Sequence, residues 1–347
     1  MDIVPSIAIE TLLERGFSNY SLVDVRSPSE YLEDHIPGAF NLPILNDEER
    51  CEIGTIYKKQ GPDVARLRGV EIVSPKLPSF IKKIKEISEL RKKVVIYCWR
   101  GGLRSEASVC FSVLAGIYCF KLTGGYKSFR KAVVGFFEHI CDKRFIVLHG
   151  PTGSGKTHIL QILKQRGYPV LDLEMCACHK GSVFGHIGEP GYDTVTQKRF
   201  ETEIFYTLNS RHEKVFFVEG ESMKIGKVSI PKSIYSLIKN GVNVQMNSSL
   251  DFRINYSLSV YNPEKFKGDI VDALNKIRRY IPSQKMTNLK NLLEEENFRD
   301  FCEELMVLYY DPLYAKGLPK KIDFTVEYDN FECAADELSK IYNSVDA

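Results

Sequence analysis

Residues 145–157 read Phe145-Ile146-Val147-Leu148-His149-Gly150-Pro151-Thr152-Gly153-Ser154-Gly155-Lys156-Thr157, an apolar run followed by a glycine-rich turn. The last eight residues fit the pattern G-x-x-x-x-G-K-[ST] at every position, between a predicted strand and a predicted helix. Backbone N–H groups of such a loop wrap a diphosphate, while Lys156 reaches a terminal phosphate and Thr157 can meet a metal ion. The stretch therefore predicts an α/β domain whose diphosphate site, the phosphate loop, is formed by Gly150, Gly153, Ser154, Gly155, Lys156 and Thr157.

The acidic residue that follows a second strand in such domains departs here from the usual pattern. The predicted strand over 215–218 ends at Glu219 rather than at the usual Asp, and Glu221 and Ser222 follow at once. Glu219 could instead be a strand-end carboxylate that caps a neighbouring helix. The pattern therefore leaves Mg²⁺ and nucleotide hydrolysis open, because a phosphate loop binds diphosphates in general and ATP is only the commonest of them.

The whole chain alternates between short apolar runs and helical patterns, which is typical of parallel sheets covered by helices. We expect two domains, 1–138 and 139–347, the first with helices on both faces of its sheet and the second with a helical C-terminal part. Residues 46–77 hold glycines and prolines among charges and predict an excursion with little regular structure. The expected strands are 20–25, 39–42, 94–98, 118–122, 145–148, 170–172, 215–218, 242–246 and 322–326, and the expected helices are 105–115, 126–139, 155–166, 195–209, 269–310 with a break at Pro282, and 331–342.

The composition indicates the cellular compartment of the protein and one class of partner. Nine scattered cysteines favour a reducing, cytoplasmic setting over a disulfide framework, and neither a secretory signal nor a membrane-spanning run is evident. The net charge of +2 is unevenly spread. Residues 1–57 carry 3 basic and 11 acidic side chains, whereas residues 58–144 carry 19 basic and 7 acidic ones. This basic block can attract a polyanion, although its lysine cluster at 82–85 also fits a solvated helix face.

A second loop, Cys98-Trp99-Arg100-Gly101-Gly102-Leu103-Arg104, follows the predicted strand over 94–98 and precedes a predicted helix. The two glycines let the backbone curl so that several N–H groups point inward, and the helix adds its positive N-terminal end. Arg100 and Arg104 add full charges. These surroundings favour thiolate over thiol, so Cys98 is a candidate nucleophile, and the same donors would hold a tetrahedral anion. We call residues 98–104 the cysteine loop.

The other cysteines have weaker claims to chemistry. Cys98 itself could be a small buried hydrophobe, the commonest role of a free cysteine, but the arginines and glycines directly after it favour the reactive role. The string Cys176-Ala177-Cys178-His179 could hold a metal, yet a single cluster without a second ligand pair is weak, and no metal site is predicted. A structural role is preferred for Cys51, Cys110, Cys119, Cys141, Cys302 and Cys333.

The first domain resembles a rhodanese. Asp24-Val25-Arg26 matches an early strand of that family, and His35-Ile36-Pro37-Gly38-Ala39 matches its turn. Rhodaneses move sulfur or selenium through a cysteine persulfide or perselenide. The spacing Cys-x5-Arg is also the signature of cysteine phosphatases, some of which share this fold, and the loop by itself does not separate the two activities.

The whole chain resembles the tRNA 2-selenouridine synthase family, in which a rhodanese domain precedes a P-loop domain. The resemblance covers about the first 310 residues, with Lys180 where Arg is expected and Gly220 where an acid is common. Beyond the two loops it rests on the strings Asn41-Leu42-Pro43, Asn46-Asp47-Glu48-Glu49-Arg50, Gly54-Thr55, Tyr57-Lys58-Lys59-Gln60-Gly61, Gly124-Gly125-Tyr126-Lys127, Asp172-Leu173-Glu174, His179-Lys180-Gly181-Ser182, Phe184-Gly185, Glu219-Gly220-Glu221-Ser222, Ile225-Gly226 and Tyr310-Asp311-Pro312.

The resemblance implies a two-step modification of 2-thiouridine at the tRNA wobble position. A geranyl group from geranyl diphosphate is attached to the sulfur, and selenium from selenophosphate then replaces the geranylated sulfur. The order is chemically reasonable, because S-alkylation makes the carbon a better electrophile and the sulfur a better leaving group. The implied substrates are geranyl diphosphate and selenophosphate, with no tightly bound cofactor and with Mg²⁺ as an ion that could assist.

The resemblance also assigns roles. The phosphate loop would hold the geranyl diphosphate beside an apolar pocket that the sequence does not locate. Cys98 would carry or deliver selenium, and Arg100 and Arg104 would hold the phosphate of selenophosphate. The basic block would meet tRNA, and Tyr97 and Trp99 could stack on the base, although packing in the core is the stronger expectation for Tyr97. Supporting or substrate-facing positions are Asp24, Arg26, His179, Lys180, Ser182, Glu219, Glu221 and Ser222.

Implied partners are the anticodon regions of the lysine, glutamate and glutamine tRNAs and, as a further candidate, the enzyme that produces selenophosphate. No membrane partner is expected. Two other functions compete with this reading. One is a rhodanese-fold cysteine phosphatase fused to a P-loop kinase-like domain, which rests on Cys-x5-Arg and the phosphate loop. The other is a nucleotide-regulated tRNA-binding protein without chemistry of its own, which an intact cysteine loop disfavours.

Overall fold

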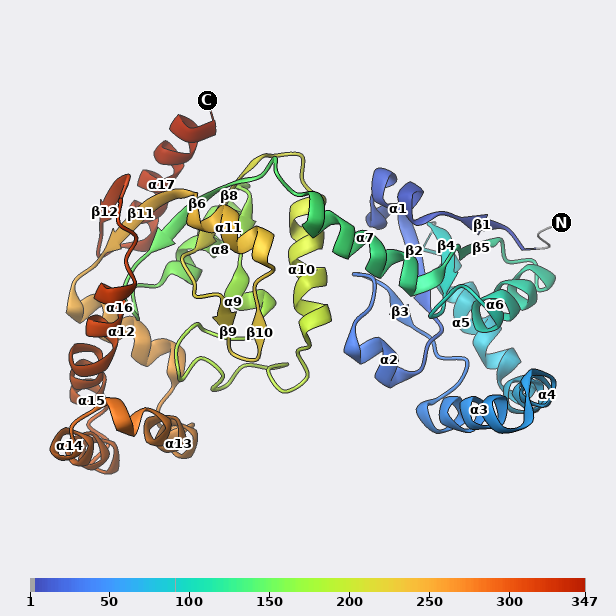
Figure 1. Cartoon of the computed structure of the whole chain (residues 1–347), viewed down its shortest axis with the longest axis horizontal. Helices are drawn as coiled ribbons and strands as arrows, with labels where there is room; N and C mark the ends of the chain where they lie inside the picture. Colours follow the sequence, from blue (N-terminus) through green and yellow to red (C-terminus); the bar gives the residue numbers. More distant parts are fainter. Residues whose placement is uncertain (1–3, 91, 347) are drawn as a thin grey trace. The chain divides into compact units, whose positions relative to one another are not determined.

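The computed structural model describes residues 4–90 and 92–346 (Figure 1). The chain divides into two compact units. The first runs to His139 and includes Glu201–Tyr206, which form the middle of a helix, α10 (Gln197–Asn209), whose two ends belong to the second unit. The second unit contains residues 140–200 and 207–346. Within the described ranges, no helix combines the length and the apolar character that crossing a lipid bilayer requires.

The first unit is built on a five-stranded sheet in the order β1-β5-β4-β2-β3, with every neighbouring pair parallel. Successive residues of the central strand enter different cores, Val95 on one face and Ile96 on the other. Helices α1 and α7 pack on the first face, and α5 and α6 on the second, which confirms the predicted architecture. The elements are β1 (Ser6–Ile7), α1 (Ile9–Arg15), β2 (Tyr20–Asp24), α2 (Pro28–Glu33), β3 (Phe40–Asn41), α3 (Asp47–Gln60), α4 (Pro62–Val73), α5 (Leu77–Ser88), β4 (Lys93–Tyr97), α6 (Leu103–Leu114), β5 (Cys119–Leu122) and α7 (Gly125–His139).

The expectation of little regular structure over 46–77 is wrong, because helices α3 and α4 occupy most of this stretch. Asn46 caps α3 by accepting a hydrogen bond from the Glu49 backbone N–H at 2.8 Å, and the Glu49 side chain accepts one in return. Gly61, at φ +94°, ends α3, and Pro62 begins α4 at a position where its missing N–H costs nothing. The glycine and proline that suggested a loop therefore mark a boundary between two helices.

The second unit holds another all-parallel sheet, in the order β12-β11-β6-β8-β7. Helices α8 and α17 cover one face of it through an apolar core that contains Ile146, Leu163 and Leu338. Beside the sheet, α13, α14 and α15 form a separate helical group with a core of its own (Figure 1). The elements are β6 (Arg144–His149), α8 (Lys156–Gln165), β7 (Val170–Leu171), α9 (Leu173–Cys176), α10 (Gln197–Asn209), β8 (Val215–Glu219), the hairpin β9 (Lys224–Ile225) and β10 (Val228–Ser229), α11 (Lys232–Lys239), β11 (Val242–Asn247), α12 (Leu250–Tyr261), α13 (Lys267–Ile277), α14 (Ser283–Glu294), α15 (Phe298–Leu305), a π-helical turn (Met306–Tyr310), α16 (Asp311–Gly317), β12 (Phe324–Glu327) and α17 (Phe331–Asp346).

Every predicted strand is present, and so is the helical region after 269 with its break near Pro282. Helix α12 was not predicted, although Ser249 directly before it accepts a hydrogen bond from the Phe252 backbone N–H in the manner of an N-cap. This omission matters, because α12 lies against the phosphate loop and contributes to the site.

Candidate functional site

The phosphate loop joins β6 to α8, as the sequence predicts. Gly155 adopts φ +72°, and a Cβ there would come within 2.3 Å of the Phe331 ring, so this position requires glycine. Lys156 donates through Nζ to the Gly150 carbonyl at 2.7 Å and lies back along the loop. The Ser154 side chain is fully buried and donates to the Pro151 carbonyl, so it shapes the loop from inside.

An arginine that the sequence analysis missed braces this loop. Arg253 of α12 donates through Nε to the Thr152 carbonyl at 2.9 Å, and its Nη1 and Nη2 atoms reach both carboxylate oxygens of Asp311. Asp311 belongs to the string Tyr310-Asp311-Pro312, which the resemblance singled out without giving it a role. This string was the signal in the sequence that could have pointed to the site. The structure shows that Asp311 orients Arg253 toward the phosphate loop.

A cluster of four carboxyl groups, Asp172, Glu174, Glu219 and Glu221, lies behind the loop. Thr157 donates through Oγ1 to Glu174 at 2.6 Å. Burial, followed by repulsion from Glu221, raises the pKa of Glu174 to about 8. Burial also raises the pKa of Asp172, Glu219 and Glu221. Glu174 is therefore largely protonated near neutral pH, and burial favours the protonated form of the other three.

Glu219 acts as a cap. Its Oε2 atom accepts a hydrogen bond from the Leu173 backbone N–H at 3.0 Å, at the start of α9, and the side chain is fully buried. This is the alternative that the sequence left open. The Thr157 hydroxyl, which the sequence offers as a contact for a metal ion, donates to Glu174 in this structure. No group of three or more His, Cys, Asp or Glu side chains suits a metal ion anywhere in residues 4–90 and 92–346, and this includes the cysteines near His179.

The phosphate loop lines a cavity, and the loop after α9 brings further predicted residues to it. Burial, followed by the nearby His186, lowers the pKa of His179 to about 4, so its ring is neutral, and its Nδ1 accepts from the Gly181 N–H. Lys180 pairs with Glu189 at 2.6 Å, and Ser182 shares a hydrogen bond with Tyr261 at 3.0 Å. The predicted residues that line the cavity are Gly150, Gly153, Gly155, Lys156, Thr157, His179, Lys180, Ser182, Glu221 and Ser222, and those that sequence reasoning missed include Tyr256, Ser257, Tyr261, Tyr309, Tyr310 and Tyr314.

The cysteine loop is a separate site in the first unit. Cys98 follows β4, and its Sγ lies 3.2 Å from Oγ of Ser105 on α6. The string Gly124-Gly125-Tyr126-Lys127 packs beneath the loop, since the Tyr126 N–H donates to the Cys98 carbonyl at 2.8 Å. A Cβ at Gly125 would come within 2.3 Å of that carbonyl oxygen. This close approach explains why glycine stands there.

The charged residues of the cysteine loop differ in their surroundings. Arg100 is exposed, whereas Arg104 donates through Nη1 to Glu30 at 2.6 Å. Burial of Glu30 is the largest single influence and raises its pKa, but the hydrogen bond and charge of Arg104, together with Ser27 and Arg50, outweigh it, so the pKa of that carboxyl is lowered. An anion bound in the loop would thus meet Arg100, which pairs with no carboxylate of the described residues, and Arg104, which already has a carboxylate partner. Gly102 and Leu103 are exposed, and Gly101 is partly so.

Asp24 and Arg26 form a fully buried ion pair at 2.6 Å beside the cysteine loop. The Arg26 guanidinium lies 4.0 Å from the centre of the Tyr126 ring and also donates to the Asp34 carbonyl. Asp24 and Arg26 therefore stabilise the packing around the cysteine loop. Tyr97 is fully buried as well, with its hydroxyl accepting from the Ile36 N–H, so it packs in the core, which was the stronger expectation, and is not placed to stack on a base. Trp99 is half-buried.

The two sites define a class of protein, in which a rhodanese-like domain with a cysteine loop is joined to a phosphate-loop domain with a helical extension. Residues 9–132 match the rhodanese-like domain family, and residues 143–343 match the family described as the tRNA 2-selenouridine synthase AAA domain. The chain belongs to the tRNA 2-selenouridine synthase family, as the resemblance predicted.

Relatives named tRNA 2-selenouridine synthase match along much of the chain. The protein of Bdellovibrio bacteriovorus is 31% identical over 343 residues, which cover 87% of this chain and 90% of that protein. The protein of Hydrogenovibrio crunogenus is 31% identical, with 93% and 96% covered. The protein of Nitrosomonas europaea is 35% identical over 257 residues, with 72% and 66% covered. The protein is therefore an enzyme of tRNA modification.

Proposed function

We propose that the protein converts wobble 2-thiouridine in tRNA to 2-selenouridine through an S-geranyl intermediate, with geranyl diphosphate and selenophosphate as co-substrates. The observation that carries the proposal is the pairing of two anion sites of different chemistry in one chain. The phosphate loop lies beside carboxyl and tyrosine side chains, and the cysteine loop holds a buried thiol beside the Ser105 hydroxyl and the Gly102 carbonyl. Each site suits one of the two steps.

In the first step, the base sulfur forms a bond to C1 of the geranyl group while the C1–O bond to diphosphate breaks. The N3 proton of the thiouridine is lost to a base. The phosphate loop and Lys156 stabilise the charge that collects on the departing diphosphate. Glu174, with a pKa of about 8, is largely protonated at neutral pH, and this reduces the negative charge that would repel the anion.

In the second step, Cys98 is proposed to deliver selenium. Its thiolate attacks phosphorus of selenophosphate, so that the S–P bond forms as the P–Se bond breaks and hydrogen selenide is set free beside the base. Selenium then adds to C2, and geranyl thiolate leaves with its electron pair. Water hydrolyses the phosphocysteine, which restores the thiol. Backbone N–H groups of residues 99–104 and the exposed Arg100 would hold the phosphoryl group.

We further propose that the substrates are the lysine, glutamate and glutamine tRNAs, held through the basic block, and that selenophosphate arrives from the enzyme that makes it. A cytoplasmic setting is consistent with nine free cysteines. The test is mass spectrometry of tRNA nucleosides after incubation with 2-thiouridine tRNA, geranyl diphosphate and selenophosphate. We expect S-geranyl-2-thiouridine when selenophosphate is omitted and 2-selenouridine when it is present. Unchanged nucleosides under both conditions would refute the proposal.

A further inference from the structure

A second, apolar pocket in the helical part of the second unit adjoins the phosphate-loop cavity. It encloses about 540 Å³ of space between the atoms, including the part open to solvent. The two spaces share five lining residues, and every one of these carries a hydroxyl group. The shared residues are Thr152, Ser182, Ser257, Tyr261 and Tyr310.

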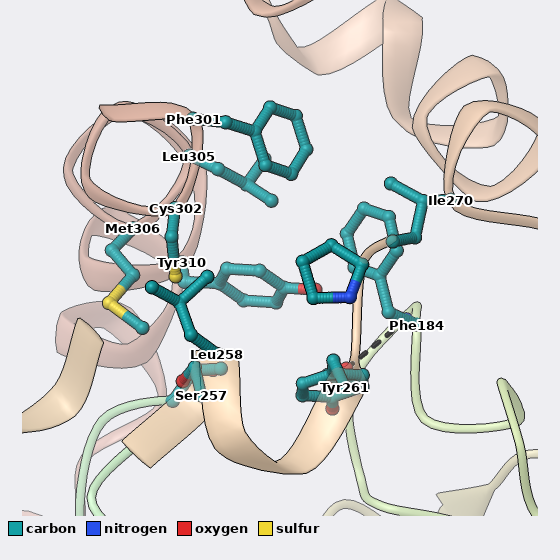
Figure 2. Close-up of a pocket in the computed structure, with 13 residues that line it drawn as sticks. Phe184, Ser257, Leu258, Tyr261, Ile270, Phe301, Cys302, Leu305, Met306 and Tyr310 are labelled. Carbon is teal, nitrogen blue, oxygen red and sulfur yellow. Dashed lines mark hydrogen bonds between the residues drawn. The ribbon is translucent and has the colours of Figure 1, made fainter. Parts of the chain in front are cut away.

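Beyond this junction the lining changes character. Among the remaining lining residues there is neither a charged side chain nor an amide, and the sulfur atoms of Cys302 and Met306 are the heteroatoms of their side chains. Figure 2 shows Phe301 and Ser257 on opposite sides of the pocket, so polarity falls from the phosphate loop toward α15. The residues that line only the apolar pocket are Phe184, Leu258, Pro263, Ile270, Phe301, Cys302, Leu305 and Met306.

Two hydroxyl groups at the junction are poorly satisfied by the protein. Ser257 and Tyr310 are buried, and neither hydroxyl makes a hydrogen bond of ordinary geometry within the described part of the chain. A buried hydroxyl without a partner is costly, and bound ligand or water relieves the cost. A Cβ at Gly153 would come within 2.6 Å of the Ser257 Oγ and 2.8 Å of the Met306 side chain, so the phosphate loop directly abuts both pocket residues.

Cys302 shows how this pocket could tolerate an electrophile. Burial raises the pKa of its thiol to about 11, with the nearby Arg253 acting in the opposite direction. The thiol is then protonated near neutral pH and is a poor nucleophile. An allylic carbon bound beside it would not be consumed by alkylation of the protein.

We propose that this apolar pocket binds the hydrocarbon chain of the allylic diphosphate while the phosphate loop holds its diphosphate, and that Phe301 and Ile270 at the far end set the accepted chain length. The inference rests on the proposed function. It adds where the hydrocarbon chain binds, which we call the tail site, and what limits the length of that chain. A ligand with an anionic head and an apolar tail matches the fall in polarity along the pocket. Each buried methylene contributes about fourfold in affinity, so a pocket that fits the tail selects strongly by length.

The test compares transfer of five-, ten- and fifteen-carbon allylic diphosphates to 2-thiouridine tRNA by the full-length protein. Phe301→Ala lengthens the pocket, and we expect the fifteen- to ten-carbon ratio of kcat/KM to rise at least tenfold. Leu258→Trp narrows it, and we expect the ten-carbon rate to fall at least tenfold while the five-carbon rate falls less. Binding of inorganic diphosphate, measured by calorimetry, should stay within about twofold of wild type in both variants.

Leu292→Trp is the matched control, because Leu292 is a half-buried leucine of the same helical group that lines neither space. It should keep the wild-type length profile. If wild type transfers no allylic group at all, the proposed function fails. If wild type transfers the ten-carbon group but Leu258→Trp and Phe301→Ala, folded by circular dichroism, keep its length profile, the tail site is wrong while the proposed function stands. Should Phe301→Ala not fold, Leu258→Trp alone decides.

Discussion

The Nε atom of Arg253 lies 2.9 Å from the carbonyl oxygen of Thr152, so a residue of α12 fixes the backbone of a loop 101 positions earlier in the chain. Asp311 completes the arrangement by accepting from both terminal nitrogens of the same guanidinium. Arg253 is a positioning residue, because it acts on the diphosphate site through the loop. The planar guanidinium fork is what allows one side chain to meet both partners.

Arg253→Lys should therefore weaken the binding of geranyl diphosphate at the phosphate loop and leave the selenium step at the cysteine loop unchanged. Lysine keeps the charge but cannot span Thr152 and Asp311 together. We expect KM for geranyl diphosphate to rise about tenfold and the unfolding free energy to fall by about 2 kcal/mol. Selenium incorporation into tRNA that already carries S-geranyl-2-thiouridine should be unchanged. Initial rates with each tRNA substrate separate the two effects.

Arg299→Lys serves as the control, since Arg299 forms an exposed pair with Asp251 and contacts neither pocket. Its stability change should stay below about 1 kcal/mol. Equal KM values for Arg253→Lys and Arg299→Lys would show that the brace does not position the loop.

The phosphate loop was predictable because eight consecutive residues specify both its backbone and its donors. The brace on it was not, since Arg253 approaches Thr152 only after α12 packs against the loop. The string containing Asp311 indicated that something there mattered, but a carboxylate in a sequence does not name its partner. The raised pKa of Glu174 was equally hidden, because it arises from burial among other acids, and burial is a property of the fold. The expected irregular stretch over 46–77 failed for a local reason, as Gly61 and Pro62 fit a helix boundary as well as a loop.

Cys98→Ala should separate the two steps of the reaction. We expect selenium incorporation to fall more than a hundredfold, because the attacking thiolate is gone, while geranylation stays within about twofold of wild type. Lys156→Ala should do the reverse and lose geranylation, since the departing diphosphate loses its lysine. Liquid chromatography with mass spectrometry quantifies both nucleosides in one digest. Cys110→Ala, which changes a half-buried cysteine outside the cysteine loop, is the control. Formation of 2-selenouridine by Cys98→Ala at the wild-type rate would remove this thiol from the mechanism.

Gly125→Ala should distort the cysteine loop. The new Cβ would lie 2.3 Å from the Cys98 carbonyl oxygen, and the residue would be held at φ +58°. We expect the first unit to lose about 2 kcal/mol of stability, and selenium incorporation to fall while geranylation persists. Fluorescence of Trp99, the single tryptophan of the chain, follows unfolding of this unit.

Gly135→Ala in the same helix is the matched control, because a Cβ there meets nothing within 4 Å. That change should leave activity intact and add about 0.5–1 kcal/mol of stability. A Gly125→Ala protein as stable and as active as Gly135→Ala would contradict the close packing of the string 124–127 beneath the loop.

Glu174 should make the second unit less stable as pH rises. Its folded pKa of about 8 lies above the ordinary value of 4.5, so between these values the folded state holds a proton that the unfolded state has released. This contribution to stability is full below about pH 4.5 and is lost as pH rises through 8, with a slope of at most about 1.4 kcal/mol per pH unit. Glu174→Gln removes the titrating group and should flatten the profile, without abolishing it, because Glu219 and Glu221 are also raised.

Native-state hydrogen exchange of the β6 and β8 amides between pH 5 and 8, corrected for intrinsic exchange, reports the stability of this unit. Glu295→Gln, a change at an exposed position of the same unit, should reproduce the wild-type slope. Inorganic diphosphate adds negative charge near Thr157, so it should raise the pKa of Glu174 further and shift the wild-type profile to higher pH, but leave that of Glu174→Gln less affected. Identical slopes for wild type and Glu174→Gln would mean that Glu174 is charged in the folded protein throughout this range.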